Sequence, residues 1–445
     1  MSGHGHPADA ANAGRAATTT ARLQDALAVA CAVYLVLLQT NLALALRSVV
    51  FGVIAALALV LVTRADVRGK AALSPPARWL AFAFLAWAAW SAASLGWSRA
   101  PAYTAGELKT DVLELGVASA AILLSLRETV VFRRYVATLL VAFAVLAAAS
   151  LAAFAPGPWN DKLMHHGVGT WSTHLVLVAP LILLVRAPPR AGFGNGRRAT
   201  ATAIALVALL LASARATENR MVWPALLASL AVIGAGSALR WPAPWRERGR
   251  ARALAFLAMA LLIGTAFVDV AFRKAESTQA PPASIERSVA EDPRLAIWPL
   301  VRARIAERPW TGHGYGKEIV GSELARELSD ATLTHAHNAF ASVWLQTGAI
   351  GLALFVAMLG AAAWRFAGYS RSRDDALALV GIAGLAILTG LVVKNLTDDF
   401  FVRTNARFLW TVVALLVAFG ERRLRVRDET RRSATAGIAP GESRP

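Results

Sequence analysis

The fold is decided by residues 334–363, THAHNAFASVWLQTGAIGLALFVAMLGAAA. The first half of this stretch carries two histidines and an asparagine, whereas residues 352–363 form an apolar run without a charged side chain. A long apolar run of this kind indicates a helix that crosses a membrane. The stretch therefore predicts a membrane helix that begins with imidazole side chains.

The composition places the whole chain in the membrane class. Of its 445 residues, 56% are hydrophobic and only 17% are charged, and the mean hydropathy is +0.50. Soluble domains are rarely this apolar. We expect an all-α integral membrane protein with about twelve transmembrane helices, placed near residues 24–40, 42–62, 79–97, 111–126, 135–155, 171–185, 199–213, 221–238, 253–270, 337–364, 376–394 and 406–420.

Basic residues divide unequally between the two sets of alternate loops. One set, with both terminal segments, contains 28 Lys and Arg, and the short loops of the other set contain 8. Because positive loops stay in the cytoplasm, we expect both termini to be cytoplasmic. The net charge of +18 comes without a nucleic-acid-binding motif, so membrane lipids and no nucleic acid are the expected partners.

These features predict five regions. They are a disordered cytoplasmic leader (1–23), nine transmembrane helices (24–270), a periplasmic loop or lid (271–336), three transmembrane helices (337–420) and a basic cytoplasmic tail (421–445).

The loop of 66 residues at 271–336 carries helical patterns and glycines. Arg294, Trp298 and Arg302 recur at the i, i+4 and i+8 spacing of one helical stripe, which Pro309 should end. A second short amphipathic helix is expected within 318–330. The glycines of TGHGYGK (311–317) are a weak phosphate-loop signal, because no strand precedes them and no lysine–serine pair follows.

Ionisable groups at the outer membrane surface are candidates for function, because burying them is costly. Arg220 lies in a short outer turn, TENR, and arginine suits bidentate contacts with phosphate; Arg215 is the alternative. Asp398 and Asp399 are interpreted as helix caps or as ion-pair partners for nearby arginines. The remaining candidates, which snorkel to the headgroups or lie at the interface on the simplest interpretation, are Arg403, Arg407, His165 and His166.

The histidines suit a general base. If Thr334 caps the helix, His335 and His337 lie in its first turn, where the helix dipole favours the neutral imidazole. Two such side chains project in different directions, so we expect no shared metal ion. His337 shares a stripe with Ala341 and is assigned inward, and Asn338 is expected to orient substrate or backbone.

Taken together, these motifs resemble the O-antigen ligase and polymerase superfamily. The resemblance rests on an arginine-bearing turn before the eighth helix, on the pattern R…W…P…G-x-G in the long loop (Arg294, Trp298, Pro309, Gly312 and Gly314), and on H-x-H-N-x-[FL]. TENR departs from the S-R-G-type turn common in the superfamily, so the arginine correspondence stays open between Arg220 and Arg215. The O-antigen ligase is the member that fits best.

The resemblance implies a glycosyltransferase of the bacterial inner membrane with a periplasmic active site. It would move O-antigen from undecaprenyl diphosphate to a sugar hydroxyl of lipid A–core, with inversion, without a cofactor and without a metal. His337 takes the general-base position. The resemblance and the sequence assign the diphosphate to Arg220, Arg294, Arg215 and Arg302, and supporting roles to Asn338, His335, Asp398 and Asp399.

Three alternatives stay open. An O-antigen polymerase uses the same donor and a different lipid-linked acceptor, and a protein O-oligosaccharyltransferase uses a protein hydroxyl. A transporter would place its polar groups near the midplane of the membrane, with internal repeats, whereas here they cluster at one surface.

Overall fold

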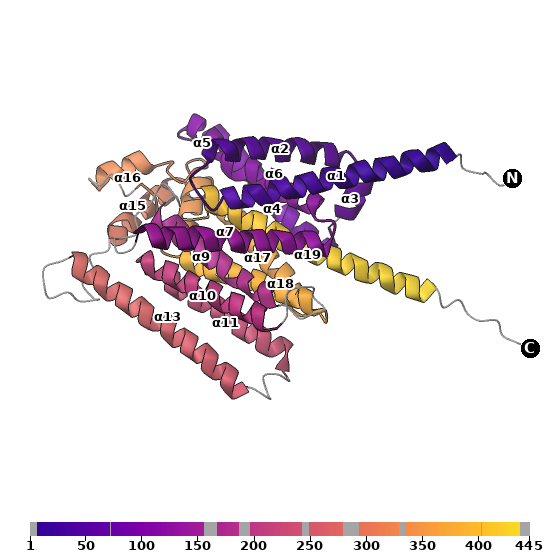
Figure 1. Cartoon of the computed structure of the whole chain (residues 1–445). Coiled ribbons are helices and arrows are strands. Elements are labelled where there is room, and N and C mark those ends of the chain that lie inside the picture. The colour runs from indigo at the N-terminus through magenta and orange to yellow at the C-terminus, as the bar shows by residue number, and fades with distance from the viewer. Residues whose placement is uncertain are drawn as a thin grey trace, which may run out of the picture.

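The computed structural model describes residues 7–71, 73–154, 167–186, 196–242, 249–278, 293–328, 334–401 and 403–436. Within these ranges the secondary structure is helical (Figure 1). The first half contains α1 (Pro7–Leu37), α2 (Leu44–Val62), α3 (Ala65–Ala71), α4 (Pro75–Ala93), η1 (Ser94–Trp97), α5 (Pro101–Leu108), η2 (Lys109–Leu113), α6 (Glu114–Ser125) and α7 (Thr129–Phe154). The second half contains α9 (Val168–Val178), η3 (Ala179–Arg186), α10 (Arg197–Ala216), α11 (Val222–Arg240), α13 (Gly249–Thr278), α15 (Pro293–Glu307), α16 (Gly321–Glu327), α17 (Ala339–Ser370), α18 (Asp375–Lys394) and α19 (Arg403–Ala436).

The predicted class, an all-α membrane protein, is confirmed. Ten helices in the described part of the chain are long and apolar enough to cross a membrane. The two other predicted spans, 111–126 and 406–420, correspond to α6 and the first half of α19. Twelve crossings stay a prediction.

Helix α18 lies at the centre of the bundle. In its most apolar window 78% of the residues are buried, against 11% in α13 at the edge. Glycines allow neighbouring helices to approach it closely, as is typical of membrane helix packing. A Cβ at Gly384 would lie 2.5 Å from the Phe366 ring, and one at Gly390 would lie 2.2 Å from Ser229 Oγ.

Ion pairs join the helices at the end of the bundle that carries the basic loops. Arg365 and Glu421 form a buried pair between α17 and α19. On the surface Arg240 pairs with Asp375 at 2.7 Å. The segment 365–373, predicted as a loop, is mostly helical because α17 continues to Ser370. Its buried arginine is stabilised there by the Glu421 carboxylate.

Helix α17 bends sharply at Gly348, which has φ 71° and ψ −176°. A straight helix of its 32 residues would be about 48 Å long, well beyond a hydrocarbon core of about 30 Å. The bend separates a short outer segment, 339–347, from residues 349–370, which are about 33 Å long at 1.5 Å per residue. The predicted single span 337–364 is therefore two helical segments.

Several segment boundaries also differ from the prediction. Helix α1 begins at Pro7, inside the segment expected to be a disordered leader; that segment is rich in alanine, a strong helix former. Helix α19 continues to Ala436, within the expected tail. The prediction of two helices in the long loop is confirmed by α15 and α16. The two helices pack together through a small hydrophobic core, which includes Ile297 and Val301 of α15 and Leu324 of α16.

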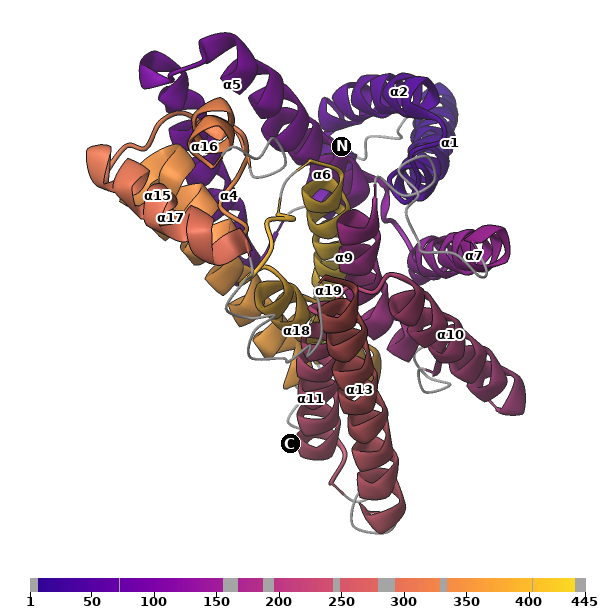
Figure 2. The same ribbon diagram turned by 90° about the vertical axis from the view of Figure 1, so that its left-hand side faces the viewer.

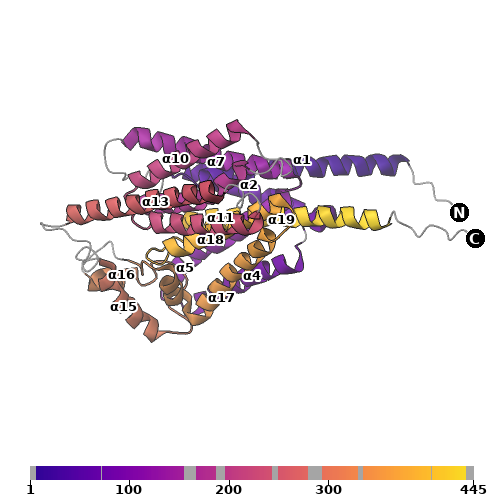
Figure 3. The same ribbon diagram turned by 90° about the horizontal axis from the view of Figure 1, so that it is seen from below.

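Different elements lie at the two ends of the bundle. The start of α1 and the end of α19 lie at one end, whereas α5, α15 and α16 lie at the other (Figures 1 and 3). Figure 2 views the second end, with α18 and α19 near its middle. We call this second end the outer end and the first the basic end.

Replacing Gly348 should destabilise the protein. An L-residue at its positive φ costs about 1–2 kcal/mol, and a Cβ would lie 2.0 Å from the Trp310 carbonyl oxygen. Gly348→Ala should lower the melting temperature of the detergent-purified protein. Gly360→Ala is the matched control in the same helix, because no atom lies within 4 Å of its added Cβ. Equal melting temperatures for Gly348→Ala and wild type would contradict this account of the bend.

The charge distribution predicts that the outer end faces the periplasm. Alkaline phosphatase fused after Pro281 should be active, and fused after Arg371 inactive, because the reporter folds only outside the cytoplasm. Immunoblots should check that both fusions are made in equal amounts. Activity in the second fusion alone would reverse the orientation.

Candidate active site

The histidine segment precedes α17 instead of opening it. Asn338 is the N-cap residue: its side-chain oxygen accepts hydrogen bonds from the backbone N–H groups of Phe340 and Ala341, both at 3.0 Å. The predicted cap, Thr334, is therefore wrong. His335 and His337 lie outside the first turn, because Asn338 is the residue that satisfies the free amides of this helix.

The two histidine rings contact each other. Their centroids are 3.9 Å apart and their planes differ by 33°, and His337 has a positive φ of 48°. The expectation that the rings project in different directions is wrong, because it assumed helical geometry. The prediction that His337 and Ala341 lie on one helical stripe is wrong for the same reason, because His337 precedes α17. The described residues contain no group of three or more His, Cys, Asp or Glu side chains placed to hold a metal ion.

Hydrogen bonds from two directions fix the backbone around these rings. Trp298 on α15 donates its indole N–H to the carbonyl of Ala336 at 3.0 Å. From the α18 side, the Asn338 side chain donates to the carbonyl of Leu396 at 2.8 Å. The predicted supporting role of Asn338 thus takes the form of a helix cap and a backbone clamp in this structure.

Asn395 connects this segment to the end of α18. Its backbone carbonyl accepts the N–H of Ala339 at 3.0 Å. Its side chain donates to the carbonyl of Leu391 at 2.8 Å and accepts the N–H of Phe400 at 2.6 Å. The residue is fully buried, so these contacts hold three chain segments in register.

Two lysines flank the Phe400 ring, which packs against Gly169. The amino group of Lys317 lies 5.2 Å from the ring centroid and that of Lys394 lies 5.0 Å from it. The Lys317 amino group also donates to the carbonyl of Asp399 at 2.8 Å. Both ammonium groups are thus close enough to the ring for cation–π contacts.

Of the two aspartates, Asp398 forms an ion pair with Lys394, four residues earlier on α18. Their predicted roles as helix caps or arginine partners stay a prediction. Asp399 is buried, and its backbone carbonyl accepts the hydrogen bond from the Lys317 amino group.

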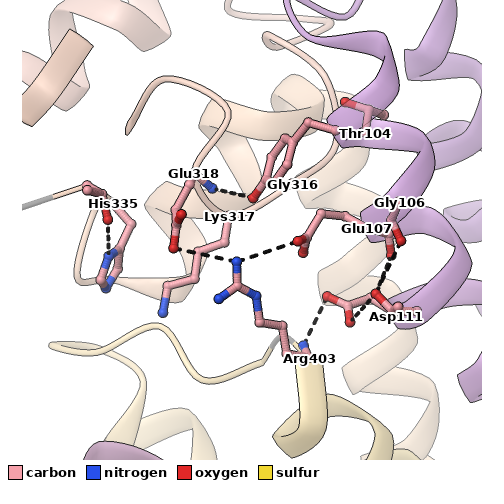
Figure 4. A network of polar contacts seen from close by, with 12 residues as sticks. Thr104, Gly106, Glu107, Asp111, Gly316, Lys317, Glu318, His335 and Arg403 are labelled. Atoms are coloured by element: carbon pink, nitrogen blue, oxygen red, sulfur yellow. Dashed lines mark hydrogen bonds and ion pairs between the residues drawn. The ribbon is translucent and has the colours of Figure 1, made fainter. Parts of the chain in front are cut away.

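Arg403 lies at the centre of a polar network that joins three segments (Figure 4). Its Nη2 atom is 3.5 Å from a carboxylate oxygen of both Glu107 and Glu318. Its backbone N–H donates to Asp111 at 2.9 Å. In Figure 4 the Lys317 side chain extends between His335 and Arg403. Arg403 is thus held by carboxylates, and its neighbour Arg407 is buried and paired with Glu114.

Tyr103 closes this network from α5. Its hydroxyl accepts the backbone N–H of Glu318 at 3.0 Å. Burial raises the pKa of Tyr103 to about 12, so the phenol stays protonated at neutral pH.

The glycine-rich loop is a packing element. Gly312, Gly314 and Gly316 all have positive φ. The amides of Gly312, His313 and Gly314 donate to backbone carbonyls, and that of Gly316 donates to the side chain of Gln346 at 3.0 Å. With these amides already bonded, the loop is not a phosphate cradle.

His313, inside this loop, is a structural histidine. Its Nε2 atom lies 2.7 Å from the Arg304 carbonyl, so the ring donates there. Burial lowers the pKa of His313, and the ring stays neutral at neutral pH.

The Arg220 turn joins α10 to α11. Asn219 accepts the N–H of Met221 at 3.0 Å and so forms the turn. The approach of Gly390 to Ala225 and to Val176 places the outer ends of α11, α9 and α18 side by side. Arg220 therefore lies at the same end of the bundle as the histidine segment.

Arg215 is committed to a different contact. Its guanidinium pairs with Asp269 of α13 at 2.8 Å, and Arg273 pairs with the same carboxylate at 3.0 Å. This ion pair joins α10 to α13.

The arginines of the long loop differ in their contacts and exposure. Arg304 pairs with Glu307, Glu323 and Glu327. Arg308 donates to the carbonyl of Trp97 at 3.0 Å. Arg302 is exposed on the stripe it shares with Trp298. Arg294 is in α15, but its side chain lies outside the described residues, as do His165 and His166.

Two site features escaped the sequence analysis. Lys317 directly follows the glycines, and that position was its only signal. Two of the carboxylates around Arg403, those of Glu107 and Asp111, lie on α5 and η2, about 300 residues away in sequence, so no local pattern could have linked them.

An apolar cavity of about 710 Å³ lies between α10, α11, α13 and η3. On α11 it is lined from Leu226 to Trp241. Leu226, the lining residue of α11 that is nearest to Arg220 in sequence, is six residues from it. Six residues correspond to about 9 Å along a helix axis.

Comparison with known families agrees with the motif analysis. Residues 201–356 match the family model described as O-antigen ligase. The match includes the Arg220 turn, the long loop and the histidine segment, so the resemblance proposed from these motifs is confirmed. No curated protein matches the chain. Residues 201–356 of this chain are therefore similar to the O-antigen ligase family.

Proposed function

We propose that the chain is an O-antigen ligase. It would transfer O-antigen glycan from undecaprenyl diphosphate to a sugar hydroxyl of lipid A–core, in an inverting and metal-independent reaction on the periplasmic face of the inner membrane. The observation that carries the proposal is the family match over 201–356, which contains the clamped histidine segment and the Arg220 turn.

The apolar cavity supports a polyprenyl donor. Its lining is apolar over four turns of α11, which suits an isoprenoid chain lying within the membrane. The diphosphate would then lie at the outer limit of the cavity, beside the Arg220 turn. We assign the diphosphate to Arg220, together with Arg294 and Arg302 of α15. Arg215, whose guanidinium contacts the Asp269 carboxylate, is the alternative to Arg220.

His337 is proposed as the general base. Its imidazole takes the proton of the acceptor hydroxyl while that oxygen attacks the anomeric carbon from the face opposite the diphosphate. The bond between the anomeric carbon and the diphosphate oxygen breaks, and the arginines stabilise the leaving anion. The proton then passes from the imidazole to solvent.

Glycan profiles of a strain that lacks the gene test the function. A ligase predicts lipid A–core without O-antigen, together with accumulated lipid-linked polymer. Lipid A–core with a single repeat unit would indicate the polymerase instead. Normal lipopolysaccharide with an unglycosylated protein would indicate the protein O-oligosaccharyltransferase, and lipid-linked substrate retained on the cytoplasmic side would indicate a transporter.

His337→Ala should reduce the transfer rate by about two to four orders of magnitude, the usual weight of a general base. Donor binding should be largely kept. His335→Ala should have a milder effect, because His335 contacts the His337 ring and would act by positioning it. The measurement is transfer by purified protein from lipid-linked donor to lipid A–core. Near-normal transfer by His337→Ala, or retention of the donor's anomeric configuration, would contradict the mechanism.

Arg220→Ala should reduce transfer by about 30- to 1000-fold, which corresponds to about 2–4 kcal/mol of lost transition-state stabilisation. Arg220→Lys should rescue poorly, because lysine lacks the planar fork of arginine. Arg371→Ala, at the basic end, is a matched control and should transfer normally. Wild-type activity in Arg220→Ala would move the assignment to Arg215 or to the arginines of α15.

Transfer should continue in excess EDTA. The arginines and lysines at the outer end would supply the positive charge that a divalent cation supplies in other transferases. The same assay, with and without chelator, is the measurement. Activity lost in EDTA and restored by magnesium or manganese would favour a cation bridging Asp398 or Asp399 to the diphosphate.

A further inference from the structure

Two apolar grooves flank α7 toward the basic end of the bundle, away from the candidate active site. The first lies between α7, η3 and α10 and encloses about 550 Å³. The second lies between α1 and α7 and encloses about 490 Å³. Both volumes are in the usual range of small-molecule sites, and nothing in the proposed transfer reaction uses either groove.

The first groove has the depth of one lipid leaflet. On α7 its lining extends from Arg133 to Ala144, eleven residues or about 16 Å along the helix axis. That length is about half of the 30 Å hydrocarbon core. Small side chains at Ala137 and Ala199 leave room between the two helices. The groove thus has the length and polarity to hold an acyl chain of a lipid in that leaflet.

Two arginines from different helices line the mouth of this groove. Arg133 lies in the second turn of α7 and Arg198 in the first turn of α10. Both side chains are exposed, so they can reach the headgroup region. A phosphate beside two guanidinium groups gains charge-assisted, bidentate hydrogen bonds, and basic pockets between membrane helices bind anionic headgroups.

We infer that this groove binds one anionic phospholipid of the leaflet at the basic end, with its phosphate on Arg133 and Arg198 and an acyl chain between α7 and α10. The contacts belong to the helices and not to the reaction. The inference therefore stands whether or not the chain is a ligase.

The second groove provides a comparison within the same molecule. It is also apolar, but its mouth carries Arg134 together with Asp25. Its lining thus carries one arginine and one carboxylate, which pairs with Arg127 at 2.8 Å, where the first groove carries two arginines. We expect no preference for an anionic lipid in this groove, so Arg134→Gln is a matched control on the same helix.

The test is native mass spectrometry of the full-length protein in detergent, titrated with phosphatidylglycerol or with phosphatidylcholine of the same acyl chains. Wild type should retain one phosphatidylglycerol in preference to phosphatidylcholine. The double variant Arg133→Gln/Arg198→Gln should bind phosphatidylglycerol about 30-fold more weakly, at about a factor of five per removed charge. Arg134→Gln should bind as wild type does.

A charge-preserving variant separates binding from folding. Arg133→Lys/Arg198→Lys should keep most of the binding, and all variants should melt within a few degrees of wild type when no lipid is added. Equal retention of phosphatidylglycerol by wild type and the glutamine double variant would overturn the inference. Equal affinity of the wild type for the two lipids, or loss of binding in Arg134→Gln, would also overturn it.

Discussion

The buried amide of Asn395 is the contact on which the outer end of the protein depends. It ends the central helix, receives the first amide of α17 and holds the chain that leads into α19. A buried polar group left without these partners would cost about 1–3 kcal/mol, so the three segments keep one arrangement. The position of the histidine segment, which lies directly before α17, therefore depends on this contact.

Close packing around α18 gives that contact a rigid base. Glycines bring α11 and α17 against the central helix, and small residues are what allow membrane helices to approach, because lipid supplies no hydrophobic driving force between them. At the basic end, the buried pair of Arg365 and Glu421 connects α17 to α19. Helices α17 and α19 are thus joined at both ends, and the candidate site lies at the outer end.

The arrangement also separates structural cations from cations that are available to a substrate. Arg304 and Arg308 hold the loop together, and Arg403 is surrounded by carboxylates. Lys317 differs, because its amino group contacts only a carbonyl and an aromatic face among the contacts described here. Among the contacts of the described residues no carboxylate neutralises this amino group, and under the proposed function such a cation would suit an anionic leaving group.

The class of the protein, the helical character of its segments and the segments that form the candidate site could all be predicted from the amino-acid sequence. Hydropathy and loop charge carry that information because each depends on neighbouring residues alone. The folded structure was needed to show that Asn338 and not Thr334 caps α17, that the rings of His335 and His337 touch, and that Arg215 pairs with Asp269. These outcomes depend on partners distant in sequence: Asn395 and Leu396 for the histidine segment, and α13 for Arg215. A local pattern names the residues of a site, but the packing of separate helices decides which of their charges remain to meet a substrate.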